Sequence, residues 1–299
     1  MSLTRHPIGT RARHDAYPRA AHHTHPMSSR PSWPTLRHRT LWVGLAWLAL
    51  IMTIAWLRQP RLAQASLLAT QTWTRVVPDT WWHALTWLGD AHWALALWWL
   101  SLAWIGQPRV ALGIAAWGAL PTITMVHVTK AWVTSPRPAA VMPEGLLHVI
   151  GPVLKMGSFP SGHTATAFYL AAAWALSVGP GRRQRWAWGL AVGVAAAVGL
   201  SRVAVGAHWW ADVLAGAVVG IWGAALGWLG QRRWGHAWPR LSWQRTGPVV
   251  ALALAASLWW RPVPADVVLV SHARSALLAG WGAWKMWRRL RPRPTAYAD

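Results

Sequence analysis

Cysteine is absent from this sequence of 299 residues, and acidic residues are few. Without cysteine the chain has no disulfide, no catalytic thiolate and no zinc–thiolate site. The seven Asp and Glu residues stand far apart, so no carboxylate cluster for Mg²⁺ or Ca²⁺ is visible. We therefore expect no metal and no cofactor. Chemistry on an anionic substrate would have to rest on Lys, Arg and His.

Charged residues are also nearly absent from several long stretches. Hydrophobic residues make up 54% of the sequence, and many of them lie in these stretches. A helix needs roughly 20 apolar residues to cross a bilayer core of about 30 Å. The pattern predicts an all-α, polytopic membrane helix bundle with six core transmembrane helices. The expected spans are Leu41–Leu57, Ala91–Gly106, Val110–Thr129, Thr164–Val178, Trp186–Leu200 and Trp209–Leu229.

Composition divides the chain into three parts. Residues 1–38 lack an apolar run and are expected to form a disordered basic cytoplasmic tail. Residues 39–230 hold the membrane domain, in which the charged segment 58–90 could lie partly at the interface as an amphipathic helix. Residues 231–299 form a basic C-terminal extension with possible additional helices. These helices could be two further crossings, a re-entrant pair or an interfacial hairpin.

The excess of basic residues gives a formal net charge of +22. In a soluble protein this balance would suggest nucleic acid, but no recognition motif supports that partner, and we expect none. Most basic residues lie between apolar blocks, where they set orientation and meet anionic lipid. With the tail inside, the cytoplasmic segments contain Arg109, then Arg182, Arg183 and Arg185, then Arg232 and Arg233. The ends of spans three and five and the starts of spans four and six then face outward.

Polar residues gather at these four outward ends. Lys130 and Arg137 follow span three, and Arg202 ends span five. As hydrogen-bond donors they suit a phosphoryl group, whose charge spreads over several oxygens. A single basic residue at a span end also occurs simply because its charge reaches the interface.

The starts of spans four and six carry the remaining polar groups. Ser161-Gly162-His163 begins a helix, where free N–H groups and the helix dipole favour an anion, although Ser161 could be only a cap. His208 and Asp212 are four residues apart and share a helix face. A carboxylate one turn away can hold one ring nitrogen of a histidine and orient the other.

Taken in order, these residues read Lys130, six residues, Arg137-Pro138; then Pro160-Ser161-Gly162-His163; then Ser201-Arg202, five residues, His208, three residues, Asp212. This set resembles the type 2 phosphatidic acid phosphatase superfamily, in its membrane branch. The superfamily includes lipid phosphate phosphatases, glucose-6-phosphatase, bacterial acid phosphatases and vanadium haloperoxidases. All three motifs match in spacing and order, and the resemblance covers about residues 38–230.

The resemblance implies a role for each matched residue. His208 would be the nucleophile that forms a phosphohistidine, and Asp212 would orient it. His163 would be the general acid and later the base. Lys130, Arg137, Ser161, Gly162 and Arg202 would bind the phosphate, without a metal. The implied protein is an integral phosphatase of the cytoplasmic (inner) membrane whose site faces the periplasm or cell exterior.

The substrate stays open at the level of sequence. A lipid phosphomonoester or diphosphate is expected because the site lies at the bilayer surface. The candidates are undecaprenyl diphosphate, which the outward site slightly favours, phosphatidic acid, phosphatidylglycerol phosphate and lipid A phosphate. Alternatives are lipid-to-lipid phosphotransfer by the same histidine, vanadium-dependent peroxidation, and a non-catalytic lipid transporter. The oligomeric state is not predicted.

Overall fold

A computed structural model of the chain describes residues 33–102, 108–235, 243–260, 262–263, 265 and 268–290. Within these ranges the regular secondary structure is helical, with no strand, which confirms the all-α prediction. The chain divides into two units, residues 1–47 and 48–299, and all packing reported below lies in the second. The expected disordered tail falls mostly outside the described residues, although α1 begins at Trp33, before the expected boundary at residue 38.

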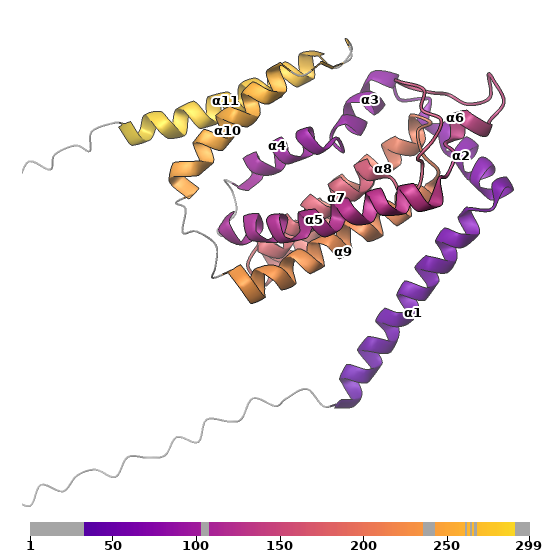
Figure 1. The fold of residues 1–299 in the computed structure, drawn as a ribbon, viewed down its shortest axis with the longest axis horizontal. Helices are drawn as coiled ribbons and strands as arrows, with labels where there is room; N and C mark the ends of the chain where they lie inside the picture. Colours follow the sequence, from indigo (N-terminus) through magenta and orange to yellow (C-terminus); the bar gives the residue numbers. More distant parts are fainter. Residues whose placement is uncertain are drawn as a thin grey trace, which may run out of the picture. The chain divides into compact units, whose positions relative to one another are not determined.

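Figure 1 shows the helices in chain order, with the longest described loop between α6 and α7. They are α1 (Trp33–Leu57), α2 (Pro60–Thr74), α3 (Asp79–Trp87), α4 (Ala91–Ser101), α5 (Pro108–Val133), α6 (Pro138–Val141), α7 (Gly162–Ser177), α8 (Arg182–Ala204), α9 (Trp210–Trp234), α10 (Trp243–Trp259) and α11 (Val268–Leu290). Proline stands in the first turn of α2 and of α6, where its missing N–H has no intrahelical partner to lose.

Three helical stretches in the described part of the chain are long and apolar enough to cross a membrane: Pro108–Val141, Arg182–Ala204 and Trp210–Trp234. A fourth arises if Val43–Leu57 of α1 and the whole of α2 are counted as one broken span. Together they are long and apolar enough to cross a membrane, although the two helices meet at an angle of 91°. The membrane bundle is thus confirmed, while the expected number of six spans stays a prediction. Helices α4 and α7 have 11 and 16 residues, which is short for a full crossing.

Helices α5, α7, α8 and α9 form the centre of the bundle, and α9 packs most extensively against α7 and α5 (Figure 1). Glycines on α9 make this approach possible. A Cβ atom at Gly220 would lie 2.4 Å from the carbonyl oxygen of Ala165 on α7, and one at Gly227 would lie 2.2 Å from that of Ile114 on α5. Small residues that let helix backbones touch are typical of membrane bundles.

The C-terminal extension contains two helices that pack on each other. Helices α10 and α11 form a hairpin, and α10 also contacts α4. The indole N–H of Trp99 on α4 donates to the carbonyl oxygen of Gly247 at 3.1 Å. The extension is thus helical, while its relation to the membrane, left open by the sequence, stays a prediction.

Candidate active site

The structure brings together the four helix ends that the sequence singled out. The backbone N–H of Ser161, at the start of α7, donates to the carbonyl oxygen of Asp212 in α9 at 2.9 Å. The carbonyl oxygen of Arg202, at the end of α8, accepts from the N–H of His208 at 3.2 Å. Lys130 lies in the last turn of α5, and Arg137 is the residue before α6.

His208 and Asp212 form a buried pair, as their spacing predicted. His208 Nδ1 lies 3.3 Å from Asp212 Oδ2, and both residues are almost fully buried. The same carboxylate oxygen accepts from the backbone N–H of Trp209 at 3.0 Å. With a proton on Nδ1, the lone pair of Nε2 is free to act. The carboxylate therefore fixes the ring and directs Nε2 away from α9.

Arg137 faces the other nitrogen of the same imidazole. Its Nη1 lies 3.4 Å from His208 Nε2 and donates to the carbonyl oxygen of Ala207 at 3.2 Å. Its Nε donates to the carbonyl oxygen of Met156 at 3.0 Å. Lys130 Nζ donates to the carbonyl oxygen of Gly157, which also accepts from Arg137 Nη2 at 3.4 Å. Two cations thus share one loop and stand beside Nε2.

Arg202 supplies a third cation from the end of α8. The residue is buried, and its Nη1 donates to the hydroxyl oxygen of Thr86 on α3 at 2.5 Å. Its buried Nε has no hydrogen-bond partner among the described residues. A buried donor without a partner is costly, and a bound anion would satisfy it. The orphaned Nε therefore fits the predicted phosphate-binding role.

The start of α7 is a capped helix end with space beside Gly162. The hydroxyl oxygen of Ser161 accepts from the backbone N–H of Thr164 at 3.4 Å and from its hydroxyl at 2.9 Å, so Ser161 is a true N-cap. A Cβ at Gly162 would meet only Val126 Cγ1, at 3.8 Å. No neighbouring chain atom therefore demands a glycine at this position, whereas close approach of an anion to the backbone would.

His163 follows in the first turn of α7. It is partly buried and lies within electrostatic reach of Arg202 and of the His208 ring. Its Cβ also lies close to the turn before α4, because a Cβ at Gly89 would be 2.8 Å from it. The two predicted catalytic histidines therefore belong to the same electrostatic cluster.

Charge and burial act in the same direction on the predicted nucleophile. Burial, reinforced by Arg202, Arg137 and Lys130, lowers the pKa of His208 well below its ordinary value of 6.5. Both effects oppose the imidazolium form. His208 is consequently neutral near pH 7, which is the form that has a nucleophilic lone pair.

Ser158 is a site residue that the sequence reasoning missed. It is fully buried, and its hydroxyl donates to Asp212 Oδ2 at 2.5 Å and lies 3.5 Å from His208 Nδ1. Its backbone N–H donates to the carbonyl oxygen of Ser135 at 3.0 Å. The available signal was a polar residue two positions before Pro160. Thr86, which contacts Arg202, gave no sequence signal.

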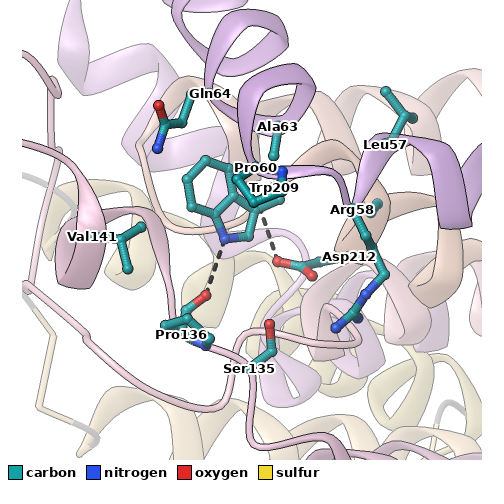
Figure 2. Close-up of a pocket in the computed structure, with 11 residues that line it drawn as sticks. Leu57, Arg58, Pro60, Ala63, Gln64, Ser135, Pro136, Val141, Trp209 and Asp212 are labelled. Atoms are coloured by element: carbon teal, nitrogen blue, oxygen red, sulfur yellow. Dashed lines mark hydrogen bonds between the residues drawn. The ribbon is translucent and has the colours of Figure 1, made fainter.

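A pocket of about 260 Å³ lies beside this cluster, with Trp209 and Asp212 in its wall (Figure 2). The other predicted site residues do not line it. Its remaining wall comes from the α1–α2 corner, the segment before Arg137 and the end of α6. Those lining residues are Leu57, Arg58, Pro60, Ala63, Gln64, Ser135, Pro136, Val141 and Ala211.

Groups of three or more His, Cys, Asp or Glu side chains that could hold a metal ion do not occur among the described residues. What the cluster offers is two imidazoles, one carboxylate, three cations and a capped helix start. Such donors suit a group with several anionic oxygens.

Comparison with known sequences gives two matches. Residues 111–236, a segment that includes all eight predicted site residues, match the family described as the PAP2 superfamily. A stretch of 70 residues is 46% identical to a lipid A 1-phosphatase of Porphyromonas gingivalis. This stretch covers 23% of the chain and 15% of that relative, so the chain matches only a small part of the relative's length.

Two solved structures are similar in fold. Aquifex aeolicus LpxE is 25% identical, with 60% of this chain and 93% of that chain covered and a TM-score of 0.42. The first transmembrane PAP2 type phosphatidylglycerolphosphate phosphatase from Bacillus subtilis is 19% identical, with coverages of 66% and 96% and a TM-score of 0.45.

Proposed function

We propose, from the match of residues 111–236 to the PAP2 superfamily, that the chain belongs to this superfamily and removes phosphate from a phosphorylated lipid with His208 as nucleophile. The observation that carries the proposal is the geometry around His208. Nδ1 is held by Asp212 at 3.3 Å, while Nε2 faces Arg137 at 3.4 Å. A neutral, oriented imidazole beside cations is the arrangement that attack on an anionic phosphorus centre requires.

In the first step Nε2 of His208 attacks phosphorus, and the bond from phosphorus to the leaving oxygen breaks. His163 gives its proton to that oxygen, so a phosphomonoester releases a neutral alcohol and a diphosphate releases the lipid monophosphate. Asp212 stabilises the imidazolium that forms on His208. Lys130, Arg137, Arg202 and the N–H groups at the start of α7 stabilise the transferred oxygens.

In the second step water attacks the phosphohistidine. His163, now neutral, takes a proton from the water, the phosphorus–nitrogen bond breaks, and inorganic phosphate leaves. The electron pair returns to Nε2, and both histidines regain their starting states. No metal takes part in either step.

We place the site at the outer face of the inner membrane. Arg109 lies at the start of α5, Arg182 at the start of α8 and Arg232 in the last turn of α9, all at helix ends opposite the site. Because positive loops favour the cytoplasm, the opposite ends, with His208 and His163, would face the periplasm or cell exterior.

For the substrate we propose a lipid phosphomonoester or diphosphate. The relative named lipid A 1-phosphatase puts lipid A phosphate first among the candidates, although the match covers a small part of that protein. Undecaprenyl diphosphate, phosphatidic acid and phosphatidylglycerol phosphate complete the panel. Phosphotransfer to a second lipid would use the same phosphohistidine with an alcohol in place of water.

The test is release of inorganic phosphate from this panel by purified protein in detergent, with and without EDTA. We expect hydrolysis that EDTA leaves intact and that His208→Ala reduces to background. His127→Ala is the matched control, since His127 is an exposed histidine on α5. Lipid consumption in excess of free phosphate would indicate phosphotransfer instead.

Labelled substrate gives a second measurement. With a labelled aryl phosphate, whose leaving group departs without a general acid, His163→Ala impairs mainly the second step, so we expect labelled phosphate to accumulate on the protein, and the label should be absent when His208 is also replaced. Near-normal turnover by His208→Ala would exclude the proposed nucleophile. No hydrolysis by the wild-type protein of any lipid would favour a non-catalytic role.

A further inference from the structure

The pocket at the α1–α2 corner has a mixed chemistry. Apolar side chains form most of its wall, and the indole of Trp209 closes one side (Figure 2). Arg58, Gln64 and Ser135 add polar groups, and these three side chains form no hydrogen bond within the described part of the chain. The indole N–H of Trp209 is already donated to the carbonyl oxygen of Pro136 at 3.0 Å. The pocket therefore offers an aromatic surface, one cation, two uncharged polar side chains and the carboxyl group of Asp212.

The position of the pocket relates it to the bilayer. It lies where α1 and α2 meet at 91°, the geometry of an apolar helix that turns to run along the membrane surface. Ile51, Met52 and Trp56, in the two turns of α1 before the corner, are more than half exposed. Leu57 continues this apolar surface into the pocket. An acyl chain could therefore lie along α1 while its headgroup reaches Arg58.

The size of the pocket fits part of a lipid. At about 260 Å³ it is slightly smaller than the roughly 300–1,000 Å³ typical of pockets that bury a whole small ligand. The Arg58 guanidinium lies 4.5 Å from the centroid of the Phe159 ring. Arg58 suits a phosphate diester, and Gln64 and Ser135 suit headgroup hydroxyls.

The pocket is distinct from the place where phosphate is transferred. It touches Asp212 and Trp209, on the side of His208 Nδ1, whereas the reacting Nε2 faces Arg137. A ligand in the pocket would nevertheless contact two anchors of the catalytic geometry. The N–H of Trp209 holds Asp212 Oδ2, and its indole holds Pro136, the residue before Arg137.

We infer that this pocket binds an anionic glycerophospholipid of the surrounding bilayer, with Arg58 on its phosphate, and that its occupancy raises turnover. The bound lipid is an effector and is not consumed. It immobilises Trp209 and thereby both Asp212 and Pro136. The inference that the bound lipid raises turnover rests on the proposed phosphatase function, whereas the inference that the lipid binds does not. The corner residues Leu57–Gln64 precede the segment that matches the family, while Trp209 and Asp212 lie within it.

Phosphatidylglycerol is the probe, because it has a phosphate diester and no phosphomonoester to be hydrolysed. It is added to the full chain in a neutral detergent, with phosphatidylcholine of the same acyl chains as the uncharged comparison. One readout is the midpoint of thermal unfolding. The other is turnover of a water-soluble aryl phosphate, which needs no lipid-binding groove. Variants Arg58→Ala and Arg58→Lys are compared with Arg61→Ala, an exposed arginine of α2 that does not line the pocket.

We expect phosphatidylglycerol to raise the unfolding midpoint and the turnover saturably in the wild type and in Arg61→Ala. A charge-assisted hydrogen bond corresponds to roughly a tenfold change in affinity or more, so Arg58→Ala should need at least about ten times more lipid. Arg58→Lys should lie between, because it keeps the charge but loses the planar fork. Gln64→Glu, nearly the same in shape, should also weaken the response by repulsion, whereas Gln59→Glu, outside the pocket, should not.

Three outcomes would overturn the inference. One is an equal lipid response in Arg58→Ala and the wild type. Another is an equal response to phosphatidylcholine and phosphatidylglycerol. The third is lipid binding that leaves turnover unchanged, because the lipid would then have no effect on catalysis through Trp209. If the wild type hydrolyses nothing but still shows an Arg58-dependent rise in unfolding midpoint, the phosphatase proposal fails and the lipid site stands.

Discussion

The helices around His208 and the C-terminal hairpin are packed in different ways. On α9, glycines bring backbone against backbone, with virtual Cβ contacts of 2.4 Å at Gly220 and 2.2 Å at Gly227. The hairpin is packed less tightly, since a Cβ at Gly282 would lie 3.0 Å from the carbonyl oxygen of Pro248, and it also uses ring surfaces, such as the stacked pair Trp259 and His272 at 4.3 Å. Close backbone contact leaves a helix less room to shift than contact through side chains. The predicted catalytic residues His208 and Asp212 stand at the start of the helix packed in the first way.

Replacing a glycine by alanine should change the free energy of unfolding very differently in the two regions, and this is the largest effect we expect. In Gly220→Ala the new methyl would lie 2.4 Å from the carbonyl oxygen of Ala165 and 2.8 Å from the backbone nitrogen of Tyr169, neither of which can rotate away. We expect a loss of about 3 kcal/mol in the free energy of unfolding, the upper end of the usual cost of overpacking, because both close contacts are with backbone atoms. Gly280→Ala is the control, because its Cβ meets nothing within 4 Å. It should gain up to about 1 kcal/mol from helix propensity.

Thermal unfolding in detergent and the yield of monodisperse protein measure both variants. Equal stability of the two would mean that α7 and α9 are not held by their backbone contact, and the contrast between the two regions would fail.

Within the site, the next largest effect is expected from a hydroxyl that holds the carboxylate. Ser158→Ala removes the donor at 2.5 Å from Asp212 Oδ2. A hydrogen bond to a charged group contributes roughly 1.5–3 kcal/mol, so kcat should fall by about ten- to a hundredfold. KM should change less, because Ser158 does not touch the cations that bind phosphate. Ser201→Ala is the matched control, since that equally buried hydroxyl bonds to its own helix at Val198.

If Ser158→Ala and Ser201→Ala lowered kcat to the same degree, the loss would reflect packing and not the orientation of Asp212. Ser158→Thr, which keeps the hydroxyl, should recover part of the activity and provides the converse check.

How far the sequence could lead differs between these features. Local patterns in the sequence predict the helix ends, from the length of apolar runs and from Gly-Pro breaks. Fixed spacings, such as the four residues from His208 to Asp212, predict the eight matched site residues. Ser158 meets Asp212 across 54 positions and Thr86 meets Arg202 across 116. Contacts of that range depend on how whole helices pack, which single-sequence periodicity does not encode. The pocket at Arg58 is missed for the same reason.

The pH dependence probes how the cations act on His208. Burial, with Arg202, Arg137 and Lys130, lowers its pKa below 6.5, so the neutral nucleophile persists as pH falls through 6.5 and is lost only below it. The acid limb of kcat/KM for wild-type protein should therefore lie below pH 6.5. Arg137→Gln removes one of the cations that lower the pKa, so the residual activity should show an acid limb moved upward. An unmoved limb would show that another group controls it.

Linkage gives the same histidine an effect on stability. In the unfolded chain a histidine binds its proton near pH 6.5, while folded His208 does not. The unfolded state then binds more protons, so the free energy of unfolding decreases as pH falls below about 6.5. His208→Phe should flatten this part of the stability curve, measured by thermal unfolding at pH 5–7.

The smallest effect is expected where the hairpin meets α4. Trp99→Phe removes the hydrogen bond from the indole N–H to the carbonyl oxygen of Gly247, at 3.1 Å. The loss should be about 1 kcal/mol and confined to the hairpin, because α10 and α11 mainly contact each other. Hydrogen exchange should accelerate in residues 246–259 and 268–288, while kcat and KM remain at wild-type values. A drop in kcat of more than about twofold, less than 0.5 kcal/mol by transition-state arithmetic, would connect the hairpin to the site. Ring-to-ring packing would then position catalytic groups as well as backbone contact does.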